Sequence, residues 1–123
     1  MDRHVIDELK ATLGHEQVLD SAEDRLVYAY DTIWTEVLPD VVVLPLDTQQ
    51  VSATLRIANQ ARVPVVPRGA SSGMSGGSVP VAGGICLSMT RMNQILEINP
   101  DDTLAVVQPG VINMDLQTAA AAY

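Results

Sequence analysis

The stretch VPRGASSGMSGGSVPVAGG, residues 66–84, decides which fold the rest of the sequence supports. It holds six of the eight glycines in the chain, and Arg68 is its only charged residue. The apolar run at residues 63–67, where the stretch begins, is typical of a short buried strand. A glycine-rich loop after such a strand lets backbone N–H groups point at an anion, and it can bind phosphate without a lysine. The alternative is a flexible surface loop, which the scarcity of charge disfavours.

Composition and charge narrow the classes of protein. The 123 residues include 15 acidic and 7 basic side chains, which gives a net charge of −8. A surface of that sign repels nucleic acid and anionic lipid, so no nucleic-acid partner is expected. Cys86 is the only cysteine, which excludes an internal disulfide, and no metal site is predicted. No apolar run approaches the ~20 residues of a membrane span and no signal segment is recognised, so a soluble cytoplasmic protein is expected.

Hydrophobic periodicity predicts an α/β fold, also describable as α+β, with a short, mainly parallel sheet and flanking helices. The spacing of apolar residues predicts three helices, at residues 2–13, from Ser21 to about Tyr30, and at residues 49–61. The buried face of the third helix is predicted to carry Val51, Leu55, Ala58 and Ala61. Continuous apolar runs at residues 40–45 and 63–67 predict two buried parallel strands, joined through the third helix as a right-handed βαβ unit.

The C-terminal third of the sequence has a different period. Residues 85–90 alternate apolar and polar side chains, as a strand does. Residues 94–108 place the turn signal NPDD between two short runs, which predicts a β-hairpin. A final helix is expected from Asn113 or Asp115 onward. No helix-ending residue precedes Tyr123, so the chain is expected to be a fragment of a longer protein.

Three known motifs do not fit the glycine-rich stretch. Gly69 to Gly73 match G-x-S-x-G, the nucleophile elbow of hydrolases, but poor helix formers follow and no histidine occurs after His15. The glycine spacing differs from the dinucleotide-binding fingerprint, which also has to open a helix. A Walker motif needs a lysine beside the last glycine, and Lys10 is the only lysine. A phosphate-binding loop remains as a type, without a common nucleotide motif.

Taken in order, these segments resemble the FAD-binding domain of the p-cresol methylhydroxylase/vanillyl-alcohol oxidase superfamily. The resemblance runs from about Tyr28 to the C-terminus. It rests on DVVVLP at residues 40–45, PRG with its glycine and serine loop, SMTRMN at residues 88–93, the hairpin, and QPGV at residues 108–111. Within the superfamily, the chain is most similar to the family of the glycolate oxidase D subunit and the D-lactate dehydrogenases.

The resemblance implies a domain, a cofactor and a substrate class. Residues 38–123 are expected to be the incomplete N-terminal part of the FAD-binding domain, after an N-terminal helical segment at residues 1–37. The implied activity is oxidation of a 2-hydroxy acid by hydride transfer to FAD, with the fragment alone inactive. Self-association of the fragment or partner oxidase subunits are further expectations. The alternative is a non-catalytic flavin- or anion-binding module that acts through a partner.

The resemblance also assigns the cofactor-binding residues, because this superfamily wraps the FAD pyrophosphate with the loop after the second strand. The residues implied are Pro67, Arg68, Gly69, Ala70, Ser71, Ser72, Gly73, Met74, Gly76 and Gly77, with Gly110 from a second segment. Ser72 stands where some relatives carry a histidine joined to FAD, so non-covalent binding is expected. The family's catalytic residues lie beyond Tyr123, and none is assigned here. Tyr30 and Trp34 are expected to anchor packing rather than to stack on a ligand.

Overall fold

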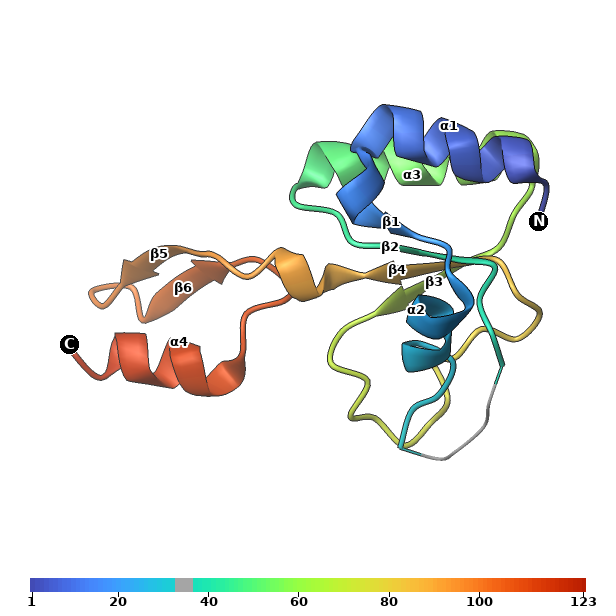
Figure 1. Cartoon of the computed structure of the whole chain (residues 1–123). Helices are drawn as coiled ribbons and strands as arrows, with labels where there is room; N and C mark the ends of the chain where they lie inside the picture. The colour runs from blue at the N-terminus through green and yellow to red at the C-terminus, as the bar shows by residue number, and fades with distance from the viewer. Residues whose placement is uncertain (33–36) are drawn as a thin grey trace.

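The computed structural model describes residues 1–32 and 37–123. Its centre is a four-stranded sheet in the order β1-β2-β4-β3, and a two-stranded hairpin lies apart from it (Figure 1). The strands of the sheet are β1 (Val18–Leu19), β2 (Val41–Val43), β3 (Val65–Arg68) and β4 (Ile85–Ser88). Strands β2, β4 and β3 run parallel, and β1 pairs antiparallel with β2. The predicted α/β class with a mainly parallel sheet is confirmed.

Strand β4 lies in the middle of the parallel strands, between β2 and β3. Cys86 of β4 pairs with Val42 on one side and with Val66 on the other. The two strands that α3 connects are therefore parallel, as predicted, but they are not neighbours. Every residue of β2 and β4 is buried, which explains the continuous apolar run of β2, since neither of its faces meets water.

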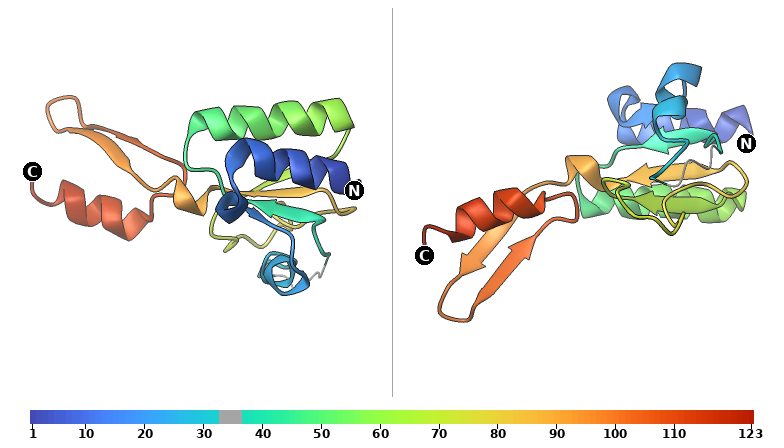
Figure 2. Two further views of the ribbon diagram at one scale, coloured as in Figure 1. Left: turned by 45° about the horizontal axis from the view of Figure 1, so that its top comes forward. Right: turned by 90° about the horizontal axis from the view of Figure 1, so that it is seen from below.

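Two helices, α1 (Arg3–Leu13) and α3 (Thr48–Ala61), cover one face of the sheet (Figures 1 and 2). Asp2 and Asp47 cap them, because each carboxylate accepts a hydrogen bond from an N–H group of the first turn. The main core lies between these helices and the sheet. Its buried residues are Val5, Ile6, Leu9, Leu13, Val18, Val41, Val43, Ile57, Ala58, Ile85 and Leu87. Helix α1 and edge strand β1 thus belong to the same core as the rest of the sheet.

The buried face of α3 differs from the predicted one. The helix buries Thr54, Ile57 and Ala58, whereas Leu55 remains 47% exposed. The reason is that α3 packs on the sheet and against α1 at the same time, so its buried face turns toward both neighbours. The hydroxyl of Thr54 is accommodated because it donates to the carbonyl oxygen of Gln50 at 2.8 Å.

The opposite face of the sheet carries α2 (Ala22–Val27) and the glycine-rich loop (Figure 1). Ser21 caps α2 by accepting a hydrogen bond from the N–H of Asp24, and the helix ends at Val27 rather than near Tyr30. A second buried cluster consists of Val42, Leu44 and Cys86, with Leu19 and Tyr28 packed against it. Trp34 lies outside the described residues. Within the described part of the chain, no helix has the length and apolar character needed to cross a membrane.

The C-terminal part projects from the end of β4 as an arm, residues 94–123 (Figures 1 and 2). Strand β4 ends at Ser88, two residues before the predicted end. It is followed by the short helix η2, and a second helix of three residues, η1, comes directly before β1. The remaining elements are η1 (His15–Gln17), η2 (Met89–Arg91), β5 (Ile95–Asn99), β6 (Leu104–Val107) and α4 (Asn113–Ala120). Strands β5 and β6 form the predicted antiparallel hairpin. Its turn is closed by Asn99, whose side-chain oxygen accepts from the N–H of Asp102 at 3.1 Å.

Candidate cofactor-binding site

The glycine-rich loop, residues 69–84, leaves the carboxyl end of β3 and returns to the start of β4 on the face opposite α1 and α3 (Figures 1 and 2). Its second half is attached to the sheet. Val79 and Pro80 are buried. The carboxylate of Asp40 accepts a hydrogen bond from the N–H of Gly84 at 2.7 Å, and the N–H of Asp40 donates to the Gly84 carbonyl at 2.8 Å. The first half, residues 69–78, lies mostly at the surface.

The first half of the loop carries backbone N–H groups that the described chain leaves unused. No described residue accepts a hydrogen bond from the backbone N–H of any of residues 70–78. The next N–H, that of Val79, donates to the carbonyl oxygen of Gly76 at 3.2 Å. A row of N–H groups without internal acceptors is what a backbone anion site offers. Residues 66–84 contain no acidic side chain, so the stretch also lacks a negative charge that would oppose an anion.

The glycines of this first half are not needed for packing within the described chain. A Cβ atom at Gly69, Gly73 or Gly77 would lie in open space, with no heavy atom within 4 Å. Gly76 also faces open space, but its φ of +72° favours glycine. A Cβ at Gly84, in contrast, would collide with the main chain just before β3. The missing side chains of the first half therefore leave the backbone accessible from outside.

Serine hydroxyls and one methionine complete the exposed part of the loop. Ser71 has a left-handed φ of 58°, and its Oγ lies 2.7 Å from the Oγ of Ser78. This hydrogen bond closes the bend between the two ends of the first half. Ser72 and Ser75 are exposed, so their hydroxyls can donate to a ligand. Met74 is 72% exposed at the tip.

The first two residues assigned by the resemblance, Pro67 and Arg68, belong to β3 itself. Pro67 pairs with Leu87 of β4. An Nη1 group of Arg68 donates to the carbonyl oxygens of Tyr30 at 2.8 Å and of Tyr28 at 3.4 Å. The guanidinium carbon lies 5.5 Å from the centre of the Tyr28 ring. The observed contacts of Arg68 are therefore made with the segment after α2.

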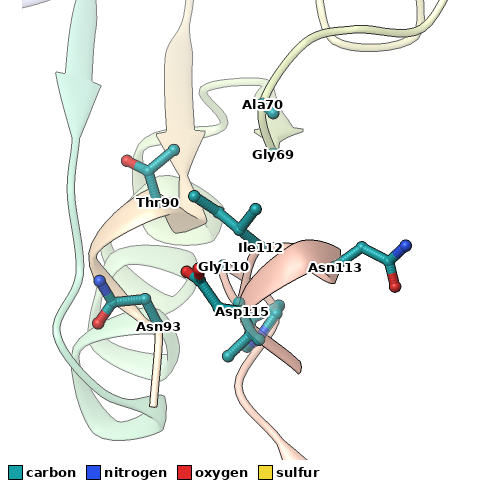
Figure 3. Close-up of a pocket in the computed structure, with 10 residues that line it drawn as sticks. Gly69, Ala70, Thr90, Asn93, Gly110, Ile112, Asn113 and Asp115 are labelled. Atoms are coloured by element: carbon teal, nitrogen blue, oxygen red, sulfur yellow. The ribbon is translucent and has the colours of Figure 1, made fainter. Parts of the chain in front are cut away.

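A cavity of about 340 Å³ lies at the carboxyl ends of β3 and β4 (Figure 3). It brings Gly110 together with Gly69 and Ala70, so that two separate parts of the predicted site meet. Its lining is Gly69, Ala70, Thr90, Asn93, Pro109, Gly110, Val111, Ile112, Asn113 and Asp115. The predicted residues from Ser71 to Gly77 do not line it. Ligands of α/β folds bind at this end of parallel strands, and the volume is at the lower end of the roughly 300–1,000 Å³ of ligand pockets.

Gly110 has a structural reason to be glycine. Its N–H donates to the carbonyl oxygen of Met92 at 2.8 Å, and a Cβ there would collide with the carbonyl oxygen of Met89. The chain leaving β6 thus passes close to the chain leaving β4. Gly110 lines the cavity at this point together with Gly69 and Ala70.

Thr90, Asn93, Ile112 and Asp115 line the cavity but were not among the predicted site residues. In Figure 3 the Ile112 side chain lies between Thr90 and the start of the loop. A signal for Thr90 and Asn93 was present, because both follow the carboxyl end of a strand and belong to the SMTRMN segment. Nothing in the local sequence indicates Ile112 or Asp115, which reach the cavity only through the turn at Gly110.

Cys86 lies in β4 and has no exposed surface. Burial raises the pKa of its thiol to about 11, and the nearby charge of Arg68, which acts in the opposite direction, does not offset this. A neutral, buried thiol does not attack a flavin. Among the described residues, no group of three or more His, Cys, Asp and Glu side chains is arranged to hold a metal ion. No catalytic residue is assigned.

Residues 39–123 match the protein family described as the FAD binding domain. The match covers more than half of the chain, and the chain belongs to this family. The unused N–H groups, open glycines and absence of acidic residues in the loop fit the anionic pyrophosphate of FAD. The predicted family and the predicted cofactor, FAD, are confirmed, whereas the individual site residues and the non-covalent mode of binding remain predictions.

The chain is similar to two curated relatives over almost its whole length. It is 43% identical over 115 residues to the glycolate oxidase subunit GlcD of Bacillus subtilis, which covers 93% of this chain and 24% of that protein. It is 39% identical over 122 residues to the D-2-hydroxyglutarate dehydrogenase of Stutzerimonas stutzeri, with 97% and 26% covered. The chain therefore spans about a quarter of the length of these relatives.

A solved structure supports the fold. The structure of p-cresol methylhydroxylase with substrate bound superposes with a TM-score of 0.85 at 24% identity, over 97% of this chain and 24% of that one. At this identity the likeness applies to the fold. It agrees with the fold class predicted from the sequence.

Proposed function

We propose that this chain is part of an FAD-dependent oxidoreductase that oxidises a 2-hydroxy acid, and that residues 69–77 hold the FAD pyrophosphate. The observation that carries the second claim is the row of N–H groups in residues 70–78, for which the described chain offers no acceptor. The first claim is supported by two relatives whose names include glycolate oxidase and D-2-hydroxyglutarate dehydrogenase. Residues 38–123 then form the N-terminal part of the FAD-binding domain, preceded by residues 1–37.

Within this proposal the loop acts through its backbone. The N–H groups of residues 70–78 donate to phosphate oxygens, and the exposed hydroxyls of Ser72 and Ser75 add two further donors. Glycines at 69, 73 and 77 let the phosphate oxygens approach the backbone, since a side chain there would occupy the same open space. FAD, when bound, supplies the acceptor for the hydride of the substrate. The cavity at Gly69 and Gly110 would receive a neighbouring part of the same cofactor.

The loop claim is tested with Gly73→Val in the complete protein that contains this chain. Valine at this position points into open space, and Gly73 does not have a positive φ, so the fold should be unaffected. We expect the purified variant to lose its flavin absorbance while its melting temperature without flavin stays unchanged. The matched control is Ala82→Val, an exposed position in the same loop but outside residues 69–77. Unchanged flavin content in Gly73→Val would contradict the claim.

The activity claim needs a separate measurement. The holoprotein is mixed anaerobically with glycolate, D-lactate or D-2-hydroxyglutarate, and the flavin absorbance is followed. Bleaching by at least one of them supports a 2-hydroxy-acid oxidoreductase, and the fastest identifies the substrate. If none of these 2-hydroxy acids reduces the flavin, the result supports the alternative function. In that case the protein is a flavin-binding module that acts through a partner. Partner oxidase subunits and a cytoplasmic location remain predictions from the sequence.

A further inference from the structure

Arg68, the last residue of β3, is held by a segment that lies 38 to 40 residues earlier in the sequence. One guanidinium N–H group reaches the carbonyl oxygen of Tyr30 at 2.8 Å and that of Tyr28 at 3.4 Å. The guanidinium also lies over the Tyr28 ring, 5.5 Å from its centre. No carboxylate of the described residues forms an ion pair with it. The contacts of Arg68 are thus with two main-chain carbonyls and one aromatic face.

The segment that receives Arg68 is itself well anchored. Tyr28 ends α2 with its N–H bonded to the carbonyl oxygen of Arg25, and it packs against the buried cluster of Val42, Leu44 and Cys86. Ala29 has no exposed surface. Its carbonyl oxygen accepts a hydrogen bond from the N–H of Val37 at 2.9 Å. The carbonyls of Tyr28 and Tyr30 therefore belong to a segment that is fixed independently of the loop.

The loop that begins after Arg68 has few other restraints in its first half. Residues 70–78 donate no backbone hydrogen bond to a described residue, and Ser71 and Ser78 bond only to each other. The next attachment to the sheet is at Val79 and Pro80, which are buried. Apart from the pairing of Arg68 with Ser88 of β4, the end of β3 is held by the contacts of the Arg68 side chain, from which the loop then leaves.

We propose that Arg68 is a positioning residue that orients the N–H groups of residues 70–78 by tying the start of the loop to Tyr28 and Tyr30. It does not act as a charge that neutralises phosphate. The claim about loop geometry stands on the contacts of Arg68 alone. Its consequence for FAD rests on the proposed function of the loop.

Substitution of Arg68 by lysine distinguishes two roles: positioning the loop, and neutralising phosphate by charge. A lysine keeps the positive charge, but its ammonium group has no planar face to stack on Tyr28 and no rigid fork of donors. A residue that neutralises phosphate by charge tolerates this exchange. A residue that holds two carbonyls and an aromatic ring does not. Arg68→Lys should therefore resemble Arg68→Gln if Arg68 positions the loop.

The first experiment measures loop geometry in the FAD-free complete protein. Cleavage within residues 69–84 by thermolysin, which cuts at apolar residues, is compared for the natural protein, Arg68→Lys and Arg68→Gln. Hydrogen exchange of the N–H groups of Tyr28, Ala29 and Val37 is measured in the same samples. We expect both variants to speed cleavage at least about fivefold, because the charge-assisted bonds to the carbonyls are lost. The exchange should not change, because the N–H groups of Tyr28, Ala29 and Val37 bond to acceptors other than Arg68. The matched control is Arg56→Lys at an exposed position of α3, which should change neither.

The second experiment measures the FAD dissociation constant of the refolded apoprotein at several salt concentrations. Both Arg68 variants should weaken binding about tenfold, the cost of one charge-assisted hydrogen bond, with the same salt dependence as the natural protein. Full affinity in Arg68→Lys, or a flatter salt dependence in Arg68→Gln, would show a charge role and overturn the proposal. Where Gly73→Val abolishes FAD binding, a fall in the melting temperature of the Arg68 variants with an unchanged dissociation constant would show a merely structural role and overturn the proposal as well.

The two proposals can fail separately. If Gly73→Val leaves FAD binding unchanged while both Arg68 variants still speed cleavage of residues 69–84, the pyrophosphate role of the loop is wrong and the geometric role of Arg68 stands. If Gly73→Val abolishes FAD binding while the Arg68 variants alter neither cleavage nor affinity, the role of Arg68 is wrong and that of the loop stands.

Discussion

At the scale of single residues, Cys86 combines burial in the central strand with a pKa raised to about 11. The thiolate is the reactive form of cysteine, and at about pH 8 this thiol is almost fully protonated as well as inaccessible. We expect the native protein not to react with the thiol reagent DTNB. After unfolding in guanidinium chloride, one thiol per chain should react at once. Reaction of the native protein at the rate of a free thiol would contradict the buried position of β4.

Asp20 is the second residue with a clear electrostatic role. It accepts a hydrogen bond from Lys10 at 2.7 Å and pairs with Arg3 at 2.9 Å. The bond from Lys10, together with the charges of Lys10 and Arg3, holds the pKa of the Asp20 carboxyl below its usual value of 3.8. Because the pKa is lowered in the folded state, the stabilisation is complete above about pH 4 and is lost as pH falls through the folded-state pKa.

Asp20→Asn tests this pair. At pH 7 we expect the free energy of unfolding to fall by about 1 kcal/mol, since the side chains of Asp20 and Lys10 are only 19% and 15% exposed. The difference from the natural protein should shrink as pH falls below about 4 and through the lowered folded-state pKa of Asp20, because the carboxylate then becomes protonated in both states. Urea titrations of both proteins at pH 7 and below about pH 4 measure this difference in the free energy of unfolding. Asp7→Asn is the control, because the carboxylate of Asp7 is 59% exposed and its bond to Arg3 should contribute little. A difference that is the same at both pH values would contradict the argument.

At the scale of elements, the junction between the loop and β4 depends on Gly84. Its φ is +84°, and a Cβ atom would meet the carbonyl oxygen and the ring of Pro64. We expect Gly84→Ala to lower the free energy of unfolding by about 2–3 kcal/mol, from left-handed strain together with a main-chain collision.

Gly77→Ala is the matched control for this element. Gly77 does not have a positive φ and has open space around it, so alanine should be neutral or stabilise the protein by up to about 1 kcal/mol. Melting temperatures of the two variants provide the comparison. Equal losses of stability would show that the loop tolerates neither and would contradict the distinction between its two halves.

At the scale of the whole molecule, the arm formed by β5, β6 and α4 exposes much of its apolar surface. Among its large side chains, Leu96 is 58%, Ile112 65%, Met114 66% and Tyr123 75% exposed. Exposed apolar patches promote association. We therefore expect this chain, produced alone, to self-associate through the arm.

Sedimentation velocity over a range of concentrations measures this association. The double variant Leu96→Glu, Met114→Glu should shift the protein toward monomer, because two charges would have to be buried in the contact. The control Leu55→Glu changes an equally exposed side chain on α3, far from the arm, and should leave the association unchanged. A chain that stays monomeric at the highest concentration would contradict the expectation.

Local sequence determined most of the elements of this protein. The apolar runs of β2 and β3 and the NPDD turn act over a few residues, and the structure has each where it was predicted. The carboxylate caps of α1 and α3, which the structure shows, also act over a few residues. The glycine-rich stretch likewise identified its loop, since the absence of Cβ atoms and of acidic charge is a property of residues 66–84 themselves. The family resemblance came from the order of these same segments.

Only the tertiary structure decided how these segments meet. Strand β4 inserts between β2 and β3 because pairing on both edges buries it completely, a choice that no local period encodes. The buried face of α3 turned toward Thr54 and Ile57 because α1 packs beside it. The side chain of Arg68 donates hydrogen bonds to the carbonyl oxygens of Tyr30 and Tyr28, which lie 38 and 40 residues earlier in the sequence. Such contacts depend on the close packing of distant segments, whereas turns, caps and open backbone depend on neighbouring residues alone.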